Sequence, residues 1–305
     1  MLLLRLVKRN ILVYIRDKAN IFFSLLSAII IIGLMVVFLG KMNADNVVGY
    51  LNEYGGIRDE AADRANAEQL VTLWTLAGIV VVNSITITLA MVGLMVSDMA
   101  QKRLPSFYVS PVNRTVFVMG YVIAAIIMGI IMCVLTVVIG EAYIGLSGGT
   151  LFSLNTMLKT LLYIILNVFT SACMVFLLAN FVHSQSAFGG LSTIIGTLVG
   201  FFAGIYLPIG MLPDKVQTVI KCFPLVHGCS FLRDAFTQEI IAKTFTNCPR
   251  ELIDGYKEFM GITILKDGTE VTGSFKVAFL ILSGILFIGI SAILQRRKNV
   301  MMSKS

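Results

Sequence analysis

Apolar residues along the chain gather in six blocks, each about 20 residues long and almost free of charged side chains. A helix of about 20 apolar residues can cross a hydrocarbon core of roughly 30 Å. The blocks are continuous and do not alternate with polar residues, which favours helices over the strands of an outer-membrane barrel. The pattern predicts an all-α polytopic membrane protein, with spans at residues 20–40, 72–97, 117–140, 157–181, 187–206 and 274–294.

Composition supports this fold class. Of 305 residues, 57% are hydrophobic and 13% are charged, whereas about a quarter are charged in an ordinary soluble domain. The net charge is +7, but two histidines, one tryptophan and the lack of a long charged tail argue against a nucleic-acid partner. The excess of positive charge is better explained by orientation in a bilayer.

Lysine and arginine gather in alternate segments between the spans. With the N-terminus inside, the two tails and the loops at 98–116 and 182–186 hold twelve basic residues against two acidic ones, Asp17 and Asp98. The other segments hold twelve basic and fifteen acidic residues. Because positive residues favour the cytoplasmic side, we expect both termini inside.

Residues 2–18 carry apolar side chains at helical spacing, with Arg5, Arg9 and Arg16 on another side. We expect residues 1–19 to form an amphipathic helix on the inner membrane surface, and 20–305 to form the six-span domain. A simpler interpretation is that residues 2–18 are a partly helical flank of the first span, whose basic residues only reflect its cytoplasmic side. The predicted apolar face comprises Leu3, Leu4, Val7, Ile11, Tyr14 and Ile15.

Two loops between spans are unusual. In the loop at 98–116, a charged turn is followed by Phe107 and Tyr108 and then by a Ser-Pro pair, which suggests a short helix along the membrane or simple interfacial anchoring by the aromatic residues. The external segment 207–273 begins with a stretch too apolar for an ordinary loop and too broken by proline and glycine to span. We expect re-entrant or interfacial helices there.

Few sequence motifs in this chain point to a chemical function. Residues 146–150 read Leu-Ser-Gly-Gly-Thr, which imitates an ATPase signature, but the chain has no phosphate-binding loop and these residues fall on the external side. No metal or nucleophile pattern stands out, and no cofactor is expected on this chain. Cys222, Cys229 and Cys248 are predicted outside, either with one disulfide among them or as free thiols.

The predicted spans contain uncharged polarity and almost no charge away from their ends. This disfavours a proton- or sodium-driven carrier, which needs ionisable residues in the membrane. Asn83 and Thr86 lie in the second span, where such residues serve helix packing or a substrate path. Ser192, Gly196, Gly200 and Gly204 form a face of small residues that would allow close helix approach.

This layout resembles the permease subunit of ABC-2 type exporters over nearly the whole chain. Two stretches carry most of the likeness. One is the Lys-Arg turn at 102–103 with the Ser-Pro-Val-Asn-Arg run at 110–114, which is similar to the family's coupling region. The other is the Pro-containing outer segment that ends in Leu232-Arg233. Gly228-Cys229 and the long stretch 237–273 depart from the family pattern.

The resemblance implies a transport subunit without its own ATPase site. It implies a dimer, with a second copy or a related permease, and two copies of a cytoplasmic ABC ATPase that would hold ATP and Mg. The expected place is a bacterial cell membrane, and the expected cargo is an amphipathic or hydrophobic drug, peptide toxin or lipid-like molecule. A secondary carrier, a membrane-embedded enzyme and a non-transporting sensor or immunity component are the alternatives.

The resemblance also implies roles for particular residues. ATPase coupling falls to Arg5, Arg9, Lys102, Arg103, Phe107 and Tyr108. The transport pathway or dimer axis would involve Asn83, Thr86, Gly196, Gly200 and Gly204. The outer gate would involve Pro208, Pro213, Pro224 and Arg233.

Overall fold

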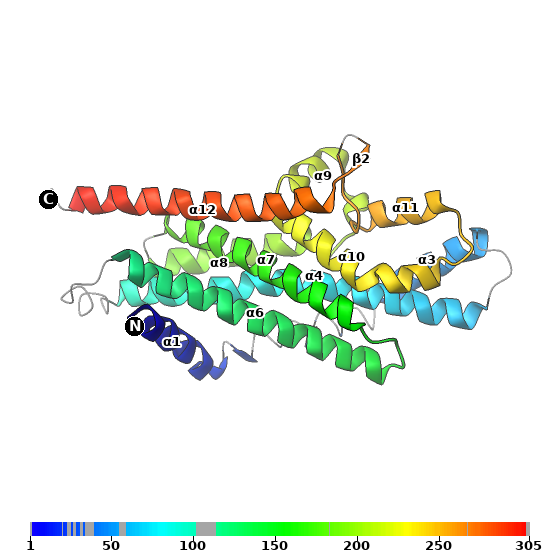
Figure 1. Cartoon of the computed structure of the whole chain (residues 1–305), viewed down its shortest axis with the longest axis horizontal. Coiled ribbons are helices and arrows are strands. Elements are labelled where there is room, and N and C mark those ends of the chain that lie inside the picture. The colour runs from blue at the N-terminus through cyan, green and yellow to red at the C-terminus, as the bar shows by residue number, and fades with distance from the viewer. Residues whose placement is uncertain are drawn as a thin grey trace.

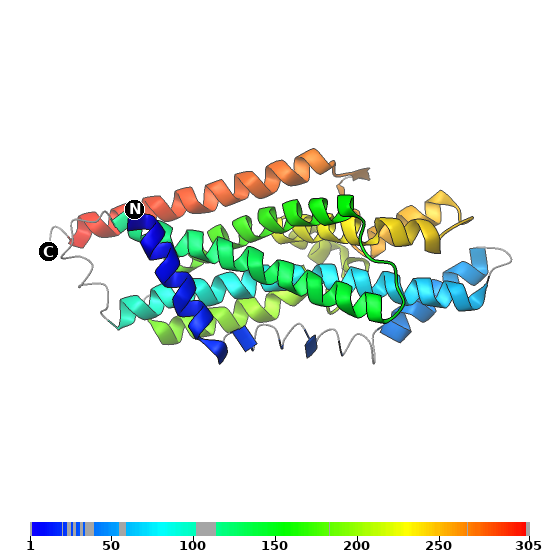
Figure 2. The ribbon, with the colours of Figure 1, turned by 60° about the horizontal axis from the view of Figure 1, so that its bottom comes forward.

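The computed structural model describes residues 2–19, 21–22, 26, 29–30, 33, 40–54, 59–101, 114–182, 184–266 and 268–302. Long helices run along the long axis of the molecule, and α1 lies across one end of them (Figures 1 and 2). In chain order the elements are α1 (Leu2–Arg16), α3 (Gly40–Tyr54), α4 (Glu60–Ala100), α6 (Arg114–Leu146), α7 (Leu154–Ala179), α8 (Gln185–Phe202), η2 (Ile209–Met211), α9 (Asp214–Lys221), α10 (Pro224–Thr244), α11 (Arg250–Phe259), β1 (Leu265–Lys266), β2 (Thr269–Glu270) and α12 (Gly273–Met302).

The long helix α4 is the core of the bundle. It packs against α3, α6, α7, α8 and α10. In its most apolar stretch 72% of the residues are buried, against 17% in the corresponding stretches of α8 and α12. Those two helices present large apolar side chains outward, among them Ile194 and Leu282. A helix at a lipid boundary needs such a surface.

Five described helices are long and apolar enough to cross a membrane: Glu60–Ala100, Val116–Leu146, Leu154–Ala179, Gln185–Phe202 and Gly273–Leu294. They match five of the six predicted spans. The predicted span at 20–40 lies largely outside the described residues, so the count of six stays a prediction. The fourth and fifth predicted spans are separate helices, because α7 ends at Ala179 and Ser184 caps α8 by accepting from the Ala187 N–H at 3.1 Å.

The helix that contains the second predicted span extends well before residue 72, and the spacing of the charged residues from Asp59 to Glu68 predicts a solvated helix there that leads into the span. α4 starts at Glu60, where the Asp59 carboxylate accepts from the N–H groups of Ala61 and Ala62. The polar stretch before residue 72 therefore belongs to the same helix. It is stabilised by α3, which packs against α4 and forms an ion pair from Asp45 to Arg64 at 3.0 Å.

Between α8 and α12 the chain forms short elements and one longer helix, α10. The expectation that proline and glycine break this region holds for η2 and α9 but is wrong for residues 224–244, which form one helix of 21 residues. Pro224 stands in its first turn, where the missing N–H costs nothing. Gly228 does not interrupt α10. A Cβ there would overlap the Asn167 side chain, so the glycine lets α10 approach α7 closely.

The predicted amphipathic helix is present as α1, but its buried face is rotated from the expected one. Leu6, Val7 and Tyr14 are buried, whereas Leu4 and Ile15 are 74% and 46% exposed. The reason is tertiary, since α1 packs on α6 and not on a featureless surface. The contact is close: a Cβ on Gly120 of α6 would lie 3.0 Å from the Leu6 Cβ.

Candidate functional site

A polar cluster joins α1 to the ends of α4 and α6. The Arg9 guanidinium on α1 forms an ion pair with the Asp98 carboxylate near the end of α4, at 2.5 Å. Tyr121 on α6 donates its hydroxyl to the same carboxylate oxygen at 2.7 Å and accepts from Arg9 at 3.1 Å. Arg9 also donates to the Asn10 side-chain oxygen at 3.0 Å. We call Arg9, Asp98 and Tyr121 the inner triad.

The inner triad is partly removed from water. The Asp98 side chain is 8% exposed and that of Arg9 is 31% exposed. The hydrogen bond to Asp98 is the main cause that raises the pKa of the Arg9 guanidinium, so Arg9 keeps its positive charge. Charge-assisted hydrogen bonds of this kind are about twice as strong as neutral ones.

The inner triad lies at both stems of the 102–113 segment. Asp98 is in the last turn of α4, and Tyr121 is in the second turn of α6. Lys102, Arg103, Phe107 and Tyr108 lie outside the described residues, so their coupling roles stay predictions. α1 thus holds together the two helices from which this segment leaves and returns.

The outward side of α1 carries positive charge. Arg5, Lys8 and Arg16 are exposed, with Leu4 and Leu12 between them. This surface remains uncovered by the described part of the chain. Arg5 and Arg9, which share a predicted role, therefore differ: Arg5 faces outward and Arg9 faces the bundle.

At the other end of the bundle a buried arginine joins three segments. Arg233 on α10 has no exposed surface. It donates to the carbonyl oxygens of Ala203 at 2.6 Å, Gly204 at 3.2 Å and Met260 at 3.0 Å. Its guanidinium carbon lies 4.0 Å from the centre of the Trp74 ring of α4, and the Trp74 indole donates to the same Met260 oxygen at 2.8 Å.

This arrangement, the outer cluster, needs glycine at two places. Gly204 and Gly261 adopt φ of 60° and 65°, in the left-handed region that favours glycine. A Cβ on either would lie 3.1 or 3.2 Å from the guanidinium nitrogens of Arg233. The sequence prediction placed Arg233 and Gly204 in different functional groups, but the structure brings them together.

The three prolines predicted for the outer gate stand at the starts of the outer helices. Pro208 precedes η2, Pro213 precedes α9, and Pro224 opens α10. Their common effect is to fix where each short helix begins.

Comparison with known sequences identifies the kind of transporter. The profile of the ABC-2 type transporter family matches residues 1–237. The chain belongs to this family. The match includes α1, the inner triad and Arg233, and no curated protein matches the chain. The protein is therefore a membrane-embedded permease of the ABC type, from a family whose members lack an ATPase site and typically work with an ATPase subunit.

In this permease the polar residues of α4 face other helices. Asn83 is 2% exposed and donates to Thr136 of α6 at 2.8 Å. The hydroxyls of Ser84 and Ser171 pair α4 with α7 at 3.0 Å. Thr86 is half-buried and bonds to the Asn83 carbonyl of its own helix at 3.4 Å. Helix packing, which the sequence left open beside a pathway role, describes Asn83 better.

The small residues of α8 do not form one helix-packing face. Gly196 has open space within 4 Å of its Cβ position, Gly200 touches the ring of Tyr206 just beyond the same helix, and Gly204 lies past the helix end. Only Gly204 contacts a distant segment, through Arg233. Open space at Gly196 leaves the α8 surface free for another chain.

The cysteines and the search for metal ligands give no further site. Cys222, Cys229 and Cys248 are not bridged in the structure, and whether one disulfide forms among them or all three stay free thiols remains a prediction. The Cys229 thiol is buried and donates to the Ala203 oxygen at 3.4 Å. His183 lies outside the described residues. Among the described residues no three His, Cys, Asp or Glu side chains gather to hold a metal.

The sequence alone assigns no functional role to three side chains of these sites, Asp98, Tyr121 and Trp74. Asp98 was counted only as an exception to the positive-inside pattern, although an acid among twelve basic residues is itself a signal for an ion pair. Trp74 carried no role, although it is the only tryptophan of the chain.

Proposed function

We propose that this permease forms the membrane part of an ATP-driven exporter. Two copies of a separate cytoplasmic ATPase subunit, which bind ATP and Mg, would drive a homodimer or a heterodimer with a related permease. The cargo would be an amphipathic or hydrophobic drug, peptide toxin or lipid-like molecule, moved out across a bacterial cell membrane. Six spans with both termini inside complete the proposal.

The inner triad is the observation that most strongly supports the proposed ATP-driven mechanism. ATP-driven closure of two motors must reach the membrane helices through contacts on the cytoplasmic side. Here α1 is fixed to both stems of the 102–113 segment, by the ion pair from Arg9 to Asp98 and by the hydrogen bond from Arg9 to Tyr121. The hydrogen bond from Tyr121 to Asp98 joins the two stems directly. A push on α1 or on that segment would therefore move α4 and α6 together.

Charge placement supports a motor-driven mechanism over an ion-coupled one. In the described parts of the candidate spans, Asp, Glu, Lys and Arg lie near helix ends or in the polar first part of α4. The middle of the bundle is instead joined by uncharged pairs such as Asn83–Thr136. A proton- or sodium-driven carrier would need ionisable groups there.

Purification in mild detergent tests the proposal directly. We expect the permease to bring down an ATPase subunit at near equal stoichiometry, with ATP hydrolysis. Recovery of the chain alone, without hydrolysis, would contradict the proposal and favour a carrier or a sensor. In the complex, Arg9→Gln should lower ATP hydrolysis severalfold without loss of assembly. Arg64→Gln is the matched control, because Arg64 also pairs with an aspartate, Asp45, but in the exposed α3–α4 contact.

Cysteine labelling tests the topology. In a Cys222→Ser and Cys248→Ser background, a membrane-impermeant maleimide should label Ala65→Cys, which is exposed on α4, from outside the cell. It should not label Ser303→Cys in the C-terminal tail unless the membrane is opened. Labelling of Ser303→Cys in intact cells would contradict the proposed orientation.

A further inference from the structure

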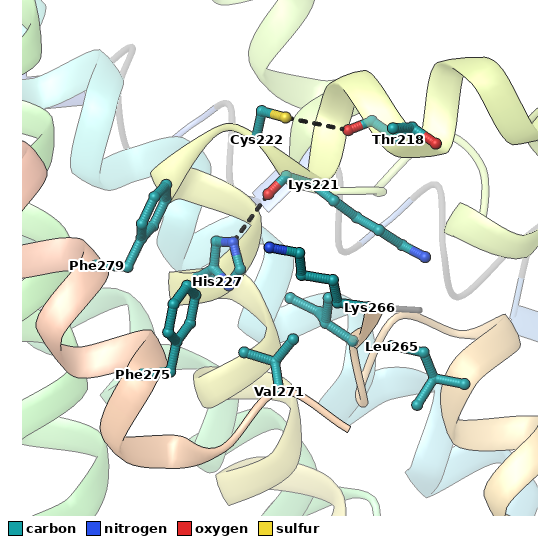
Figure 3. Close-up of a pocket in the computed structure, with 10 residues that line it drawn as sticks. Thr218, Lys221, Cys222, His227, Leu265, Lys266, Val271, Phe275 and Phe279 are labelled. Carbon is teal, nitrogen blue, oxygen red and sulfur yellow. Dashed lines mark hydrogen bonds between the residues drawn. The ribbon is translucent and has the colours of Figure 1, made fainter. Parts of the chain in front are cut away.

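A cavity of about 400 Å³ lies where α9, α10, the β1–β2 hairpin and α12 meet (Figure 3). This volume falls within the roughly 300–1,000 Å³ range of small-molecule sites. None of the residues assigned to coupling, pathway or gate lines it. It is lined by Thr218, Lys221, Cys222, His227, Ile264, Leu265, Lys266, Val271, Phe275 and Phe279.

One wall of the cavity is aromatic and apolar. The ring centres of Phe275 and Phe279 on α12 lie 6.0 Å apart, and that of His227 lies 4.8 Å from Phe279. Val271 closes the wall from the hairpin side (Figure 3). Because Phe275 and Phe279 belong to the first two turns of a candidate span that starts at Gly273, the wall lies at the level where hydrocarbon meets headgroups.

His227 contributes no positive charge to this wall. Its Nε2 donates to the Lys221 carbonyl oxygen at 2.9 Å, and burial lowers the pKa of the imidazole. The residue is 4% exposed, and its burial disfavours a positive charge on the ring. It acts as a flat, uncharged surface beside the two phenylalanines.

The opposite side carries two cations. Lys221 comes from the end of α9 and Lys266 from β1. Figure 3 shows the Lys266 side chain pointing into the cavity toward His227, whereas the Lys221 side chain runs away from His227 and the two phenylalanines. Within the part of the chain that the structure describes, neither ammonium group has a carboxylate partner within 4.0 Å, and the lining contains no acidic residue. Asp267 lies outside the described residues. Among the described residues, the lining thus offers positive charge next to apolar rings and no acidic side chain beside it.

We propose that this cavity binds an anionic amphiphile, with its carboxylate or phosphate at Lys266 and its apolar chain along Phe275 and Phe279. A free inorganic anion would gain nothing from the aromatic wall, and a neutral hydrophobic molecule would leave Lys266 without a counter-charge. An amphiphile of this class has two possible sources, the surrounding lipid leaflet and the transported cargo.

A photolabelling experiment on the full complex in nanodiscs tests the site. The probe is a twelve-carbon fatty acid with a diazirine on its chain, and the comparison probe is the corresponding alcohol, which lacks the charge. We expect the acid to label Phe275, Phe279 or Val271, and the alcohol to label them about tenfold less. Equal labelling by both probes, or acid labelling only elsewhere, would overturn the proposal.

Lysine variants localise the charge. Lys266→Gln should reduce labelling by the acid about tenfold, Lys266→Arg should restore most of it, and Lys243→Gln should have no effect. Lys243 is a suitable control because it is an exposed lysine at the far end of α10. Unchanged labelling in Lys266→Gln would refute the assigned role of this lysine as the anion partner.

ATP identifies the source. Labelling that falls during ATP turnover supports the cavity as a station of the cargo. Labelling that ignores ATP and is displaced by phosphatidylglycerol in the nanodisc supports a leaflet lipid. Both results require the same binding chemistry. Only the ATP comparison rests on the proposed function, and the comparison of acid with alcohol in the permease stays interpretable if that function fails.

Discussion

Within the inner triad, removing the charge of Arg9 should lower the free energy of unfolding more than removing the charge of Asp98. The Asp98 side chain is 8% exposed, so after Arg9→Gln its carboxylate stays buried without the charge of Arg9. Loss of one partner from a fully buried pair costs roughly 3–5 kcal/mol, and the 31% exposure of Arg9 reduces this to about 2–3 kcal/mol. After Asp98→Asn, Arg9 can turn its guanidinium to water and the amide can still accept from Tyr121, so we expect about 1 kcal/mol.

Thermal unfolding of the purified complex would measure this asymmetry, with Arg9→Gln, Asp98→Asn and the double variant compared in one detergent. The double variant should be less destabilised than the sum of the single variants, by about 1–2 kcal/mol. Protease digestion at α1 would show whether the helix has detached. If Asp98→Asn costs as much as Arg9→Gln, or if the two changes are additive, the buried-carboxylate reasoning is wrong.

Two further predictions concern coupling and helix contact. Charge reversal of Lys102 and Arg103 should reduce ATP-driven export while membrane insertion and dimerisation, followed by gel filtration, stay normal; unchanged export would remove both from coupling. Alanine substitutions should form a graded stability series by thermal unfolding. Gly228→Ala should cost about 1–3 kcal/mol because Asn167 is buried and cannot yield, whereas Gly255→Ala, with open space, should be within about 1 kcal/mol of the parent. Equal costs would show that the α7–α10 contact tolerates a methyl group.

The sequence predicted those features that depend on local pattern. Apolar runs located five helices long enough to span, and periodicity located α1. The apolar run alone does not show where α4 starts, because Asp59 caps the helix in a polar stretch, but the spacing of the charged residues from Asp59 to Glu68 predicts a helix there. The true buried face of α1 was missed because the surface of α6 decides it, and helical spacing alone cannot show which residues meet that surface.

The residues of the two sites also divide into those that the local sequence marks and those that it does not. Arg9 could be selected from charge placement, but its partner Tyr121 lies inside an apolar run and nothing local marks it. Arg233 could be selected from a motif, but Trp74 and the Ala203 and Met260 carbonyls come together only after three distant segments fold. Buried polar contacts between distant segments therefore cannot be predicted from the sequence and are seen only in the structure.

The inner triad and the outer cluster are attached to one continuous helix. Asp98 and Trp74 both belong to α4, and at about 1.5 Å per residue they stand roughly 36 Å apart along its axis. α4 has no break between them, and most of its apolar stretch is buried. Because a packed helix transmits displacement better than it bends, a movement imposed on α1 would reach the Arg233 contacts as a shift or rotation of α4. Coupling across the membrane then requires two stable positions of a single helix, and the carbonyl bonds of Arg233 are the contacts that would differ between them.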